Sequence, residues 1–139
     1  MRRSLTLAAA AVVVSASLAA CSSDDSSGEM VGGMTECTDE IINAEAEKVV
    51  DANSGGENVW SPMTVECADG WAVASGSIDI KDAPADGPQG APASLIFEQE
   101  GQFWIPKDKQ DVCGTIDGET YPSDALVPEA LFLVGCLSG

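Results

Sequence analysis

The side chains that could do acid–base or nucleophilic chemistry in this sequence are nearly all carboxylates. Its 139 residues include 23 Asp and Glu, 6 Lys and Arg, and no histidine. The absence of histidine excludes Ser-His-Asp and Cys-His nucleophile systems. Phosphate-binding and HExxH metal motifs are also absent. A carboxylate pair could hydrolyse a glycosidic bond, but so many acids make any choice of pair arbitrary. We therefore expect no enzymatic activity, no catalytic residues and no cofactor.

A group of acidic residues between positions 79 and 87 superficially resembles a calcium-binding loop. It consists of Asp79, Asp82 and Asp86, followed by Gly87. The spacing differs from the D-x-[DN]-x-[DN]-G pattern of such loops, and three prolines lie nearby. Residues 81–92 are rich in Pro, Gly, Asp and Ala, which is typical of a long mobile loop. We therefore expect no metal site and interpret Asp82 and Asp86 as part of a possible binding surface.

Three tryptophans could form an exposed aromatic platform for a sugar or a peptide. Trp71 and Trp104 fall within expected strands, so we expect both in the core. Trp60 precedes Ser61-Pro62 and is the best candidate for exposure. It joins Asp82 and Asp86 in the possible binding surface.

The N-terminal segment has the layout of an export signal. Arg2 and Arg3 precede an apolar run from Leu5 to Leu18, which is too short to span a bilayer. The sequence Leu18-Ala19-Ala20-Cys21 resembles the lipobox of bacterial lipoproteins. That resemblance implies cleavage before Cys21, attachment of acyl chains such as palmitate to Cys21, and a stable hold on the outer side of the cell membrane. An ordinary secretory signal cleaved after Ala19 or Ala20, or export by the twin-arginine route, are the alternatives.

Five cysteines leave an even set of four once Cys21 carries lipid. In an oxidising compartment these four are expected to form two disulfides, for which three pairings are possible. We predict Cys37–Cys67 and Cys113–Cys136, since each pair would tie a helix to nearby strand material. A zinc site is disfavoured because the spacing is wide and neither CxxC nor histidine is present.

The sequence divides into a signal peptide (1–20), a lipidated Cys21 with a flexible tether (21–35), and one small domain (36–139). The tether is polar and Gly-rich, and a coil of this length reaches roughly 20 Å. After removal of residues 1–20, four lysines and 23 acids give a formal charge of −19, and no arginine remains. Such a charge disfavours nucleic acid and repels anionic headgroups. The acidity indicates solubility alone, or else a basic partner or the capture of divalent cations.

Periodicity and turn signals predict an α+β domain. The expected elements, in chain order, are a helix from Thr38 to Asn53, strands over Met63–Cys67 and Trp71–Ile80, strands over Leu95–Glu98 and Phe103–Ile105, and a helix from Pro128 to Cys136. The four strands should form an antiparallel meander with the helices against one face. In the second strand the apolar residues change from odd-numbered to even-numbered positions, which predicts a bulge at Gly76.

A further resemblance covers residues 67–136. The segments Cys67-Ala68-Asp69-Gly70-Trp71-Ala72, Leu95-Ile96-Phe97, Gly101-Gln102-Phe103-Trp104 and Val127-Pro128-Glu129-Ala130-Leu131, together with Cys113 and Cys136, look like a pattern in small, uncharacterised exported proteins of high-GC Gram-positive bacteria. The shared features are cysteines, hairpin glycines and core aromatics, so the resemblance implies a fold and no activity.

These observations predict a membrane-anchored cell-envelope lipoprotein whose domain is a non-enzymatic binding or interaction module. Its partners would be the membrane, through the lipid, and an envelope protein or cell-wall component. The alternative is an inhibitor or regulator of an extracytoplasmic enzyme or receptor, with the acidic loop at 81–92 engaging a basic site. A small hydrolase is the least favoured class.

Overall fold

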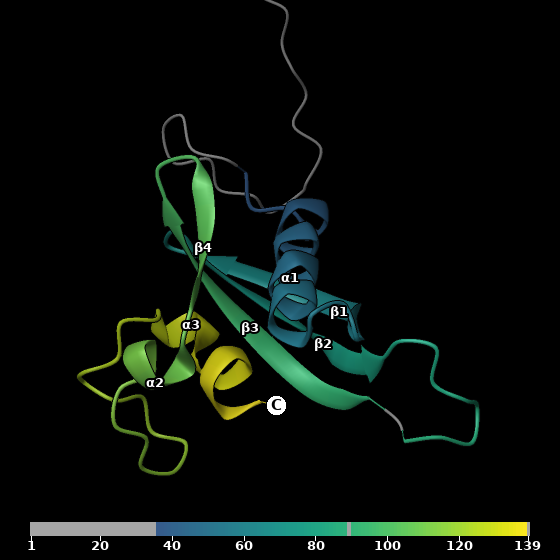
Figure 1. Ribbon diagram of the computed structural model, residues 1–139. Helices are drawn as coiled ribbons and strands as arrows, with labels where there is room; N and C mark the ends of the chain where they lie inside the picture. The colour runs from purple at the N-terminus through teal and green to yellow at the C-terminus, as the bar shows by residue number, and fades with distance from the viewer. Residues whose placement is uncertain (1–35, 89, 139) are drawn as a thin grey trace, which may run out of the picture.

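A four-stranded antiparallel sheet lies between a long helix and a group of short helices (Figure 1). The computed structural model describes residues 36–88 and 90–138, so the predicted signal, Cys21 and tether lie outside the described residues. The strands follow one another in the order β1-β2-β3-β4. The elements are α1 (Asp39–Ser54), β1 (Asn58–Ala68), β2 (Trp71–Ile80), β3 (Ala91–Glu100), β4 (Phe103–Lys107), α2 (Lys109–Val112), α3 (Glu129–Phe132) and the π-helix η1 (Leu133–Leu137). The predicted α+β meander with flanking helices is confirmed.

Local sequence explains where α1 begins and ends. The side chain of Thr38 accepts a hydrogen bond from the backbone N–H of Ile41 at 3.3 Å, which caps the first turn. Acidic residues in that turn suit the positive end of the helix dipole. At the other end Gly55 adopts a left-handed conformation (φ 64°), and its N–H bonds to the carbonyl of Asp51. The helix prediction was therefore correct to within one residue at each end.

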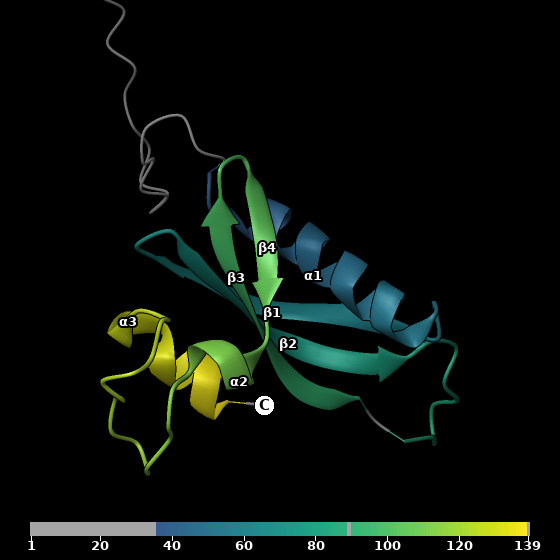
Figure 2. The same cartoon turned by 60° about the vertical axis from the view of Figure 1, so that its left-hand side comes forward.

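The two faces of the sheet are both covered, so the expectation that all helices share one face was wrong. Alternate residues of a strand point to opposite faces. Helix α1 packs on one face, in a cluster that we call the α1-side core: Ile42, Ala46, Val50, Trp60, Ala72, Ala74, Phe97 and Trp104. The other face carries the C-terminal core: Trp71, Val73, Ile96, Val112, Cys113, Val127, Leu131 and Phe132. Figure 2 shows α1 and α3 on opposite sides of the sheet.

The predicted bulge lies on the neighbouring strand. The register between β1 and β2 shifts between Pro62 and Thr64, so the extra residue is Met63 on edge strand β1 and not Gly76. Strand β2 pairs with β3 without a register shift from Trp71 to Ile78. Its residues are buried on both faces, so its sequence does not alternate simply between polar and apolar residues. Gly76 is small for another reason: a Cβ there would clash with the backbone carbonyl oxygen of Ser61 and would lie 2.8 and 2.9 Å from ring carbons of Trp60. The ring of Trp60 therefore packs directly over the backbone of β2.

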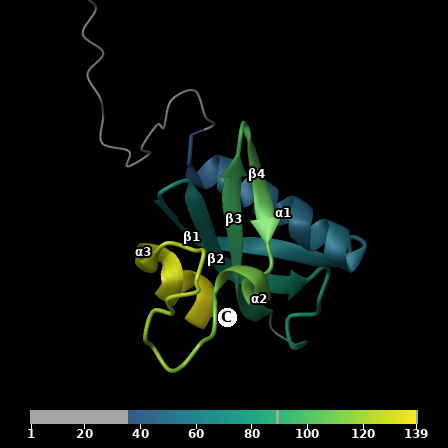
Figure 3. The same cartoon turned by 90° about the vertical axis from the view of Figure 1, so that its left-hand side faces the viewer.

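The C-terminal helix changes type halfway. Four α-helical residues are followed by a π-helical turn over Leu133–Leu137. Within that turn Gly135 packs closely against the sheet, since a Cβ would lie 3.0 Å from a Val73 methyl carbon. An irregular segment, residues 113–128, connects α2 to α3 on the side of the sheet opposite α1 (Figure 3). The short helices thus place Gly135 directly against the sheet, while Leu131 and Phe132 are buried in the same C-terminal core.

Candidate functional site

Both predicted disulfides are present. Cys37 pairs with Cys67, with their Cα atoms 6.4 Å apart, and Cys113 pairs with Cys136, at 5.7 Å. The first joins the residue before the α1 cap to the end of β1. The second joins the end of α2 to η1. All four cysteines in the described part of the chain are therefore cross-linked to one another.

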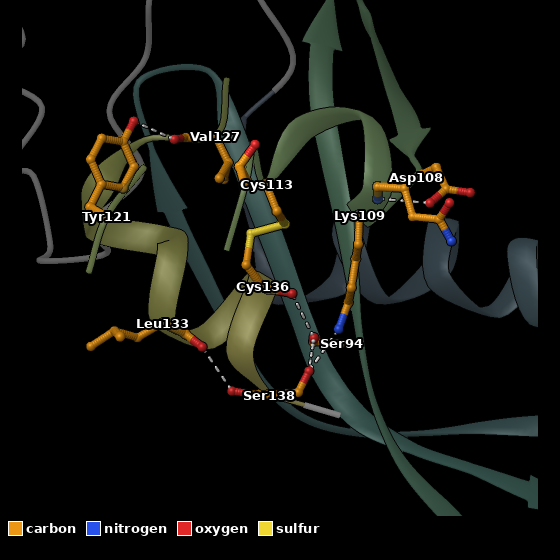
Figure 4. The surroundings of a disulfide bond; sticks show 12 residues. Ser94, Asp108, Lys109, Cys113, Tyr121, Val127, Leu133, Cys136 and Ser138 are labelled. Atoms are coloured by element: carbon orange, nitrogen blue, oxygen red, sulfur yellow. Dashed lines mark hydrogen bonds between the residues drawn. A yellow bond between two sulfur atoms is a disulfide. The ribbon is translucent and has the colours of Figure 1, made fainter. Parts of the chain in front are cut away.

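Polar contacts around Cys113–Cys136 fix the end of the C-terminal helix (Figure 4). The hydroxyl of Ser94, the one polar side chain buried in the described core, contacts the carbonyl oxygens of Gly135 at 3.0 Å and Ser138 at 2.8 Å. The ammonium group of Lys109 donates to the same Ser138 carbonyl at 2.7 Å, and burial lowers the pKa of Lys109. A cation and a hydroxyl donor at the carbonyl end of a helix stabilise it. The arrangement therefore has a structural role.

A second set of hydrogen bonds organises the segment after Cys113. The carboxylate of Asp124 accepts from the backbone N–H of Thr115 at 3.0 Å and from its hydroxyl at 2.9 Å. The bonds from Thr115, that from its backbone N–H first, lower the pKa of Asp124. The hydroxyl of Tyr121 donates to the carbonyl of Val127 at 2.9 Å. Sequence reasoning missed these contacts because their partners are separated by loops that carry no periodic signal.

Trp60 is not exposed, and its prediction as a binding residue was wrong. Only 6% of its surface is accessible, and its indole N–H donates to the side-chain oxygen of Asn43 on α1 at 3.1 Å. The reason is that β1 begins at Asn58, five residues before the predicted start at Met63, so Trp60 lies inside the strand. Proline is tolerated on an edge strand. Trp71 and Trp104 are buried, as predicted.

The acidic loop joins β2 to β3 at one end of the sheet, and residues 81–86 of it are exposed (Figure 1). Asp82 and Asp86 are exposed within it, whereas Asp79 lies in β2. The Asp79 carboxylate accepts hydrogen bonds from Ser61 and from Ser77, the latter at 3.1 Å. The same carboxylate also lies directly against Gly90, where a Cβ would have no room, so it ties the end of β2 to the chain just before β3. Across residues 36–88 and 90–138, no three acidic, cysteine or histidine side chains gather as metal ligands would.

Two of the four lysines in the described domain are neutralised by glutamates. Lys48 pairs with Glu45 at 2.7 Å, and Lys107 pairs with Glu98 at 2.9 Å and Glu100 at 2.5 Å. Hydrogen bonds to these two glutamates, that to Glu100 first, raise the pKa of Lys107. Twenty of the 23 acidic residues follow position 35, against four lysines. The described surface is therefore strongly acidic, with few cations available to a partner.

Comparison with protein-family models, with curated proteins and with solved structures finds no match for this chain. No helix among the described residues is long and apolar enough to cross a membrane.

Proposed function

We propose that this chain is a lipid-anchored, extracytoplasmic lipoprotein whose domain binds a partner without catalysing a reaction. The observation that carries the proposal is the pairing of cysteines. Cys37, Cys67, Cys113 and Cys136 are bonded to one another, and disulfides of this kind persist in oxidising compartments outside the cytoplasm. The remaining cysteine, Cys21, ends the lipobox-like Leu18-Ala19-Ala20-Cys21.

Electrostatics supports the choice of partner. Lys48 and Lys107 are neutralised within the domain by their glutamate neighbours, so an excess of solvated carboxylates remains. Such a surface attracts basic proteins or cationic wall components and repels nucleic acids and anionic headgroups. The partner class that fits is therefore an envelope protein or cell-wall component that carries positive charge.

Fractionation of cells that express the wild-type and the Cys21→Ser chain tests the anchor. Wild-type protein should stay with membranes after a high-salt wash, because acyl chains hold it by hydrophobic burial. Cys21→Ser protein should be released or should remain unprocessed, and Ser22→Ala, as the matched control, should behave as wild type. Correctly cleaved Cys21→Ser protein that remains membrane-bound would contradict the proposal.

A second candidate function is inhibition or regulation of an extracytoplasmic enzyme or receptor through the acidic loop. The observation that favours it is the exposure of Asp82 and Asp86 on the segment that joins β2 to β3. Partner capture with Asp82→Asn/Asp86→Asn protein tests it, with Asp117→Asn, which is also exposed, as the control. Loss of the captured partner with the loop variant alone supports this function, and unchanged capture contradicts it.

A further inference from the structure

The two disulfides differ in their surroundings. Cys113 is 1% exposed and lies within the C-terminal core. Cys67, in contrast, is exposed near the end of edge strand β1, and its partner Cys37 is partly buried against the α1-side core. Thiol–disulfide exchange needs an attacking thiolate to reach one of the two sulfur atoms. The exposed position of Cys67 offers that access, whereas Cys113 is shielded by packed side chains and its partner Cys136 is partly buried against the C-terminal core.

We propose that Cys37–Cys67 is a reversible, redox-sensitive clip between the entrance of α1 and the end of β1, and that Cys113–Cys136 is a permanent cross-link. The proposal does not depend on lipidation or on a binding partner. Its reductant is a dithiol outside the cytoplasm, either a small molecule or a protein with a Cys-x-x-Cys site.

The exchange has a defined direction. A reductant thiolate attacks Sγ of Cys67, the Sγ–Sγ bond breaks, and the electron pair leaves on Sγ of Cys37, which takes a proton from solvent. The second thiol of the reductant then attacks the reductant's own sulfur in the mixed disulfide and releases Cys67. Two electrons pass from the dithiol, which becomes a disulfide, to the protein cystine, which becomes two thiols. Cys37 lies just before the Thr38 cap, where the dipole of α1 favours the departing negative charge.

The fold should survive this reduction, because other contacts hold both ends of the clip. Helix α1 keeps its buried residues Ile42, Ala46 and Val50 against the sheet, and the Thr38 cap does not involve the disulfide. Strand β1 keeps its pairing with β2 as far as Ala68, opposite Trp71. Opening the clip therefore releases residues 36 and 37, where the chain enters the domain, and leaves the sheet intact.

Neighbouring carboxylates should make the clip selective for the charge of the thiol. Glu36 and Glu66 directly precede the two cysteines, and both are exposed. At low ionic strength these two carboxylates repel the thiolate of glutathione, whose other groups carry a net negative charge, more than a thiolate whose other groups are neutral or cationic. At equal thiolate concentration, cysteamine should react fastest, 2-mercaptoethanol next and glutathione slowest.

Timed reduction of the full chain carrying Cys21→Ser tests the proposal directly. The protein is treated with dithiothreitol, free thiols are alkylated at intervals, and the labelled peptides are quantified by mass spectrometry. Cys37 and Cys67 should be labelled at least ten times faster than Cys113 and Cys136, with an unchanged circular dichroism spectrum. Three results would each overturn the proposal. They are equal labelling rates for the two bridges, earlier opening of Cys113–Cys136, and a circular dichroism spectrum of an unfolded chain once Cys37–Cys67 is open.

Two additional experiments test whether global unfolding controls the opening and whether charge governs the selectivity. Low urea concentrations should speed the opening of Cys113–Cys136 but not of Cys37–Cys67. Parallel acceleration of both would show that global unfolding controls both, and would overturn the proposal. Glu36→Gln/Glu66→Gln should raise the rate with glutathione several-fold, whereas Glu119→Gln, an exposed acid in the segment between α2 and α3, should not. Equal effects of both variants would contradict the charge selectivity.

Discussion

Removal of each disulfide in turn should destabilise the domain to different extents, with the larger loss at Cys113–Cys136. The cross-linked residues are 30 positions apart in Cys37–Cys67 and 23 apart in Cys113–Cys136. In the loop-entropy model these separations correspond to about 3.7 and about 3.5 kcal/mol of the free energy of unfolding. Chain entropy alone therefore predicts nearly equal losses, with the longer loop slightly ahead.

The burial of Cys113 reverses the order of the two expected losses in the free energy of unfolding. Cys113 is 1% exposed and packs in the C-terminal core, so replacement of its sulfur leaves a cavity that costs roughly 1 kcal/mol. Cys67 is exposed and leaves no such cavity. The expected losses are then about 4.5 kcal/mol for Cys113→Ala/Cys136→Ala and about 3.7 kcal/mol for Cys37→Ala/Cys67→Ala. Both are large fractions of the 5–15 kcal/mol that is typical of a domain.

Urea unfolding of the two double variants, followed by tryptophan fluorescence in a Cys21→Ser background, measures these differences. The parent protein with both disulfides provides the reference, and the slope of each transition shows whether the unfolded state has changed. A larger loss for Cys37→Ala/Cys67→Ala, or losses below about 1 kcal/mol in both, would refute the reasoning.

Three further predictions concern the core and the segment after Cys113. Gly76→Ala should cost about 1–3 kcal/mol in urea unfolding, because the new Cβ meets the Trp60 ring; an unchanged midpoint would contradict this close packing. Iodide should not quench Trp60 fluorescence in a chain whose other tryptophans are replaced by Phe, since Trp60 is 6% exposed; strong quenching would restore it as a surface residue. The bonds from Thr115 lower the pKa of Asp124, so the stabilisation from this carboxylate is fully present above its ordinary pKa and is lost as the pH falls through its lowered pKa. Unfolding measured from pH 2 to pH 7 should therefore show wild type more stable than Asp124→Asn at neutral pH, with a gap that narrows in acid; a gap that widens in acid would contradict this assignment.

The parts of the fold that sequence predicted correctly depend on local signals. Thr38, the acids after it and the apolar stripe of α1 are all within one helix, and the structure follows them. The hairpin turn at Asp69-Gly70 is equally local, and both residues have positive φ. The disulfide pairing was also predicted correctly. Cys37–Cys67 joins a helix entrance to a strand as expected, whereas Cys113–Cys136 joins the end of α2 to η1 and involves no strand.

The errors come from contacts between distant segments. Ala72 and Val73 are neighbours in sequence, but one faces α1 and the other faces the C-terminal core, so β2 shows no simple alternation of polar and apolar residues. That pattern was misinterpreted as a bulge at Gly76. Trp60, which precedes Ser61-Pro62, was the best candidate for exposure, yet Trp60 and Pro62 both lie in edge strand β1, whose register shifts after Pro62. The exposure of a strand side chain depends on which helix covers its face of the sheet, and the pattern of residues along the sequence does not specify that.

The most direct test of the proposed function is the mass of the N-terminal peptide of the protein extracted from membranes. We predict a mature chain that begins at Cys21 and carries a diacylglyceryl group, with or without a third acyl chain. The four later cysteines should be recovered as two disulfides. An unmodified Cys21, or an N-terminus at another residue, would contradict the lipid anchor on which the account rests.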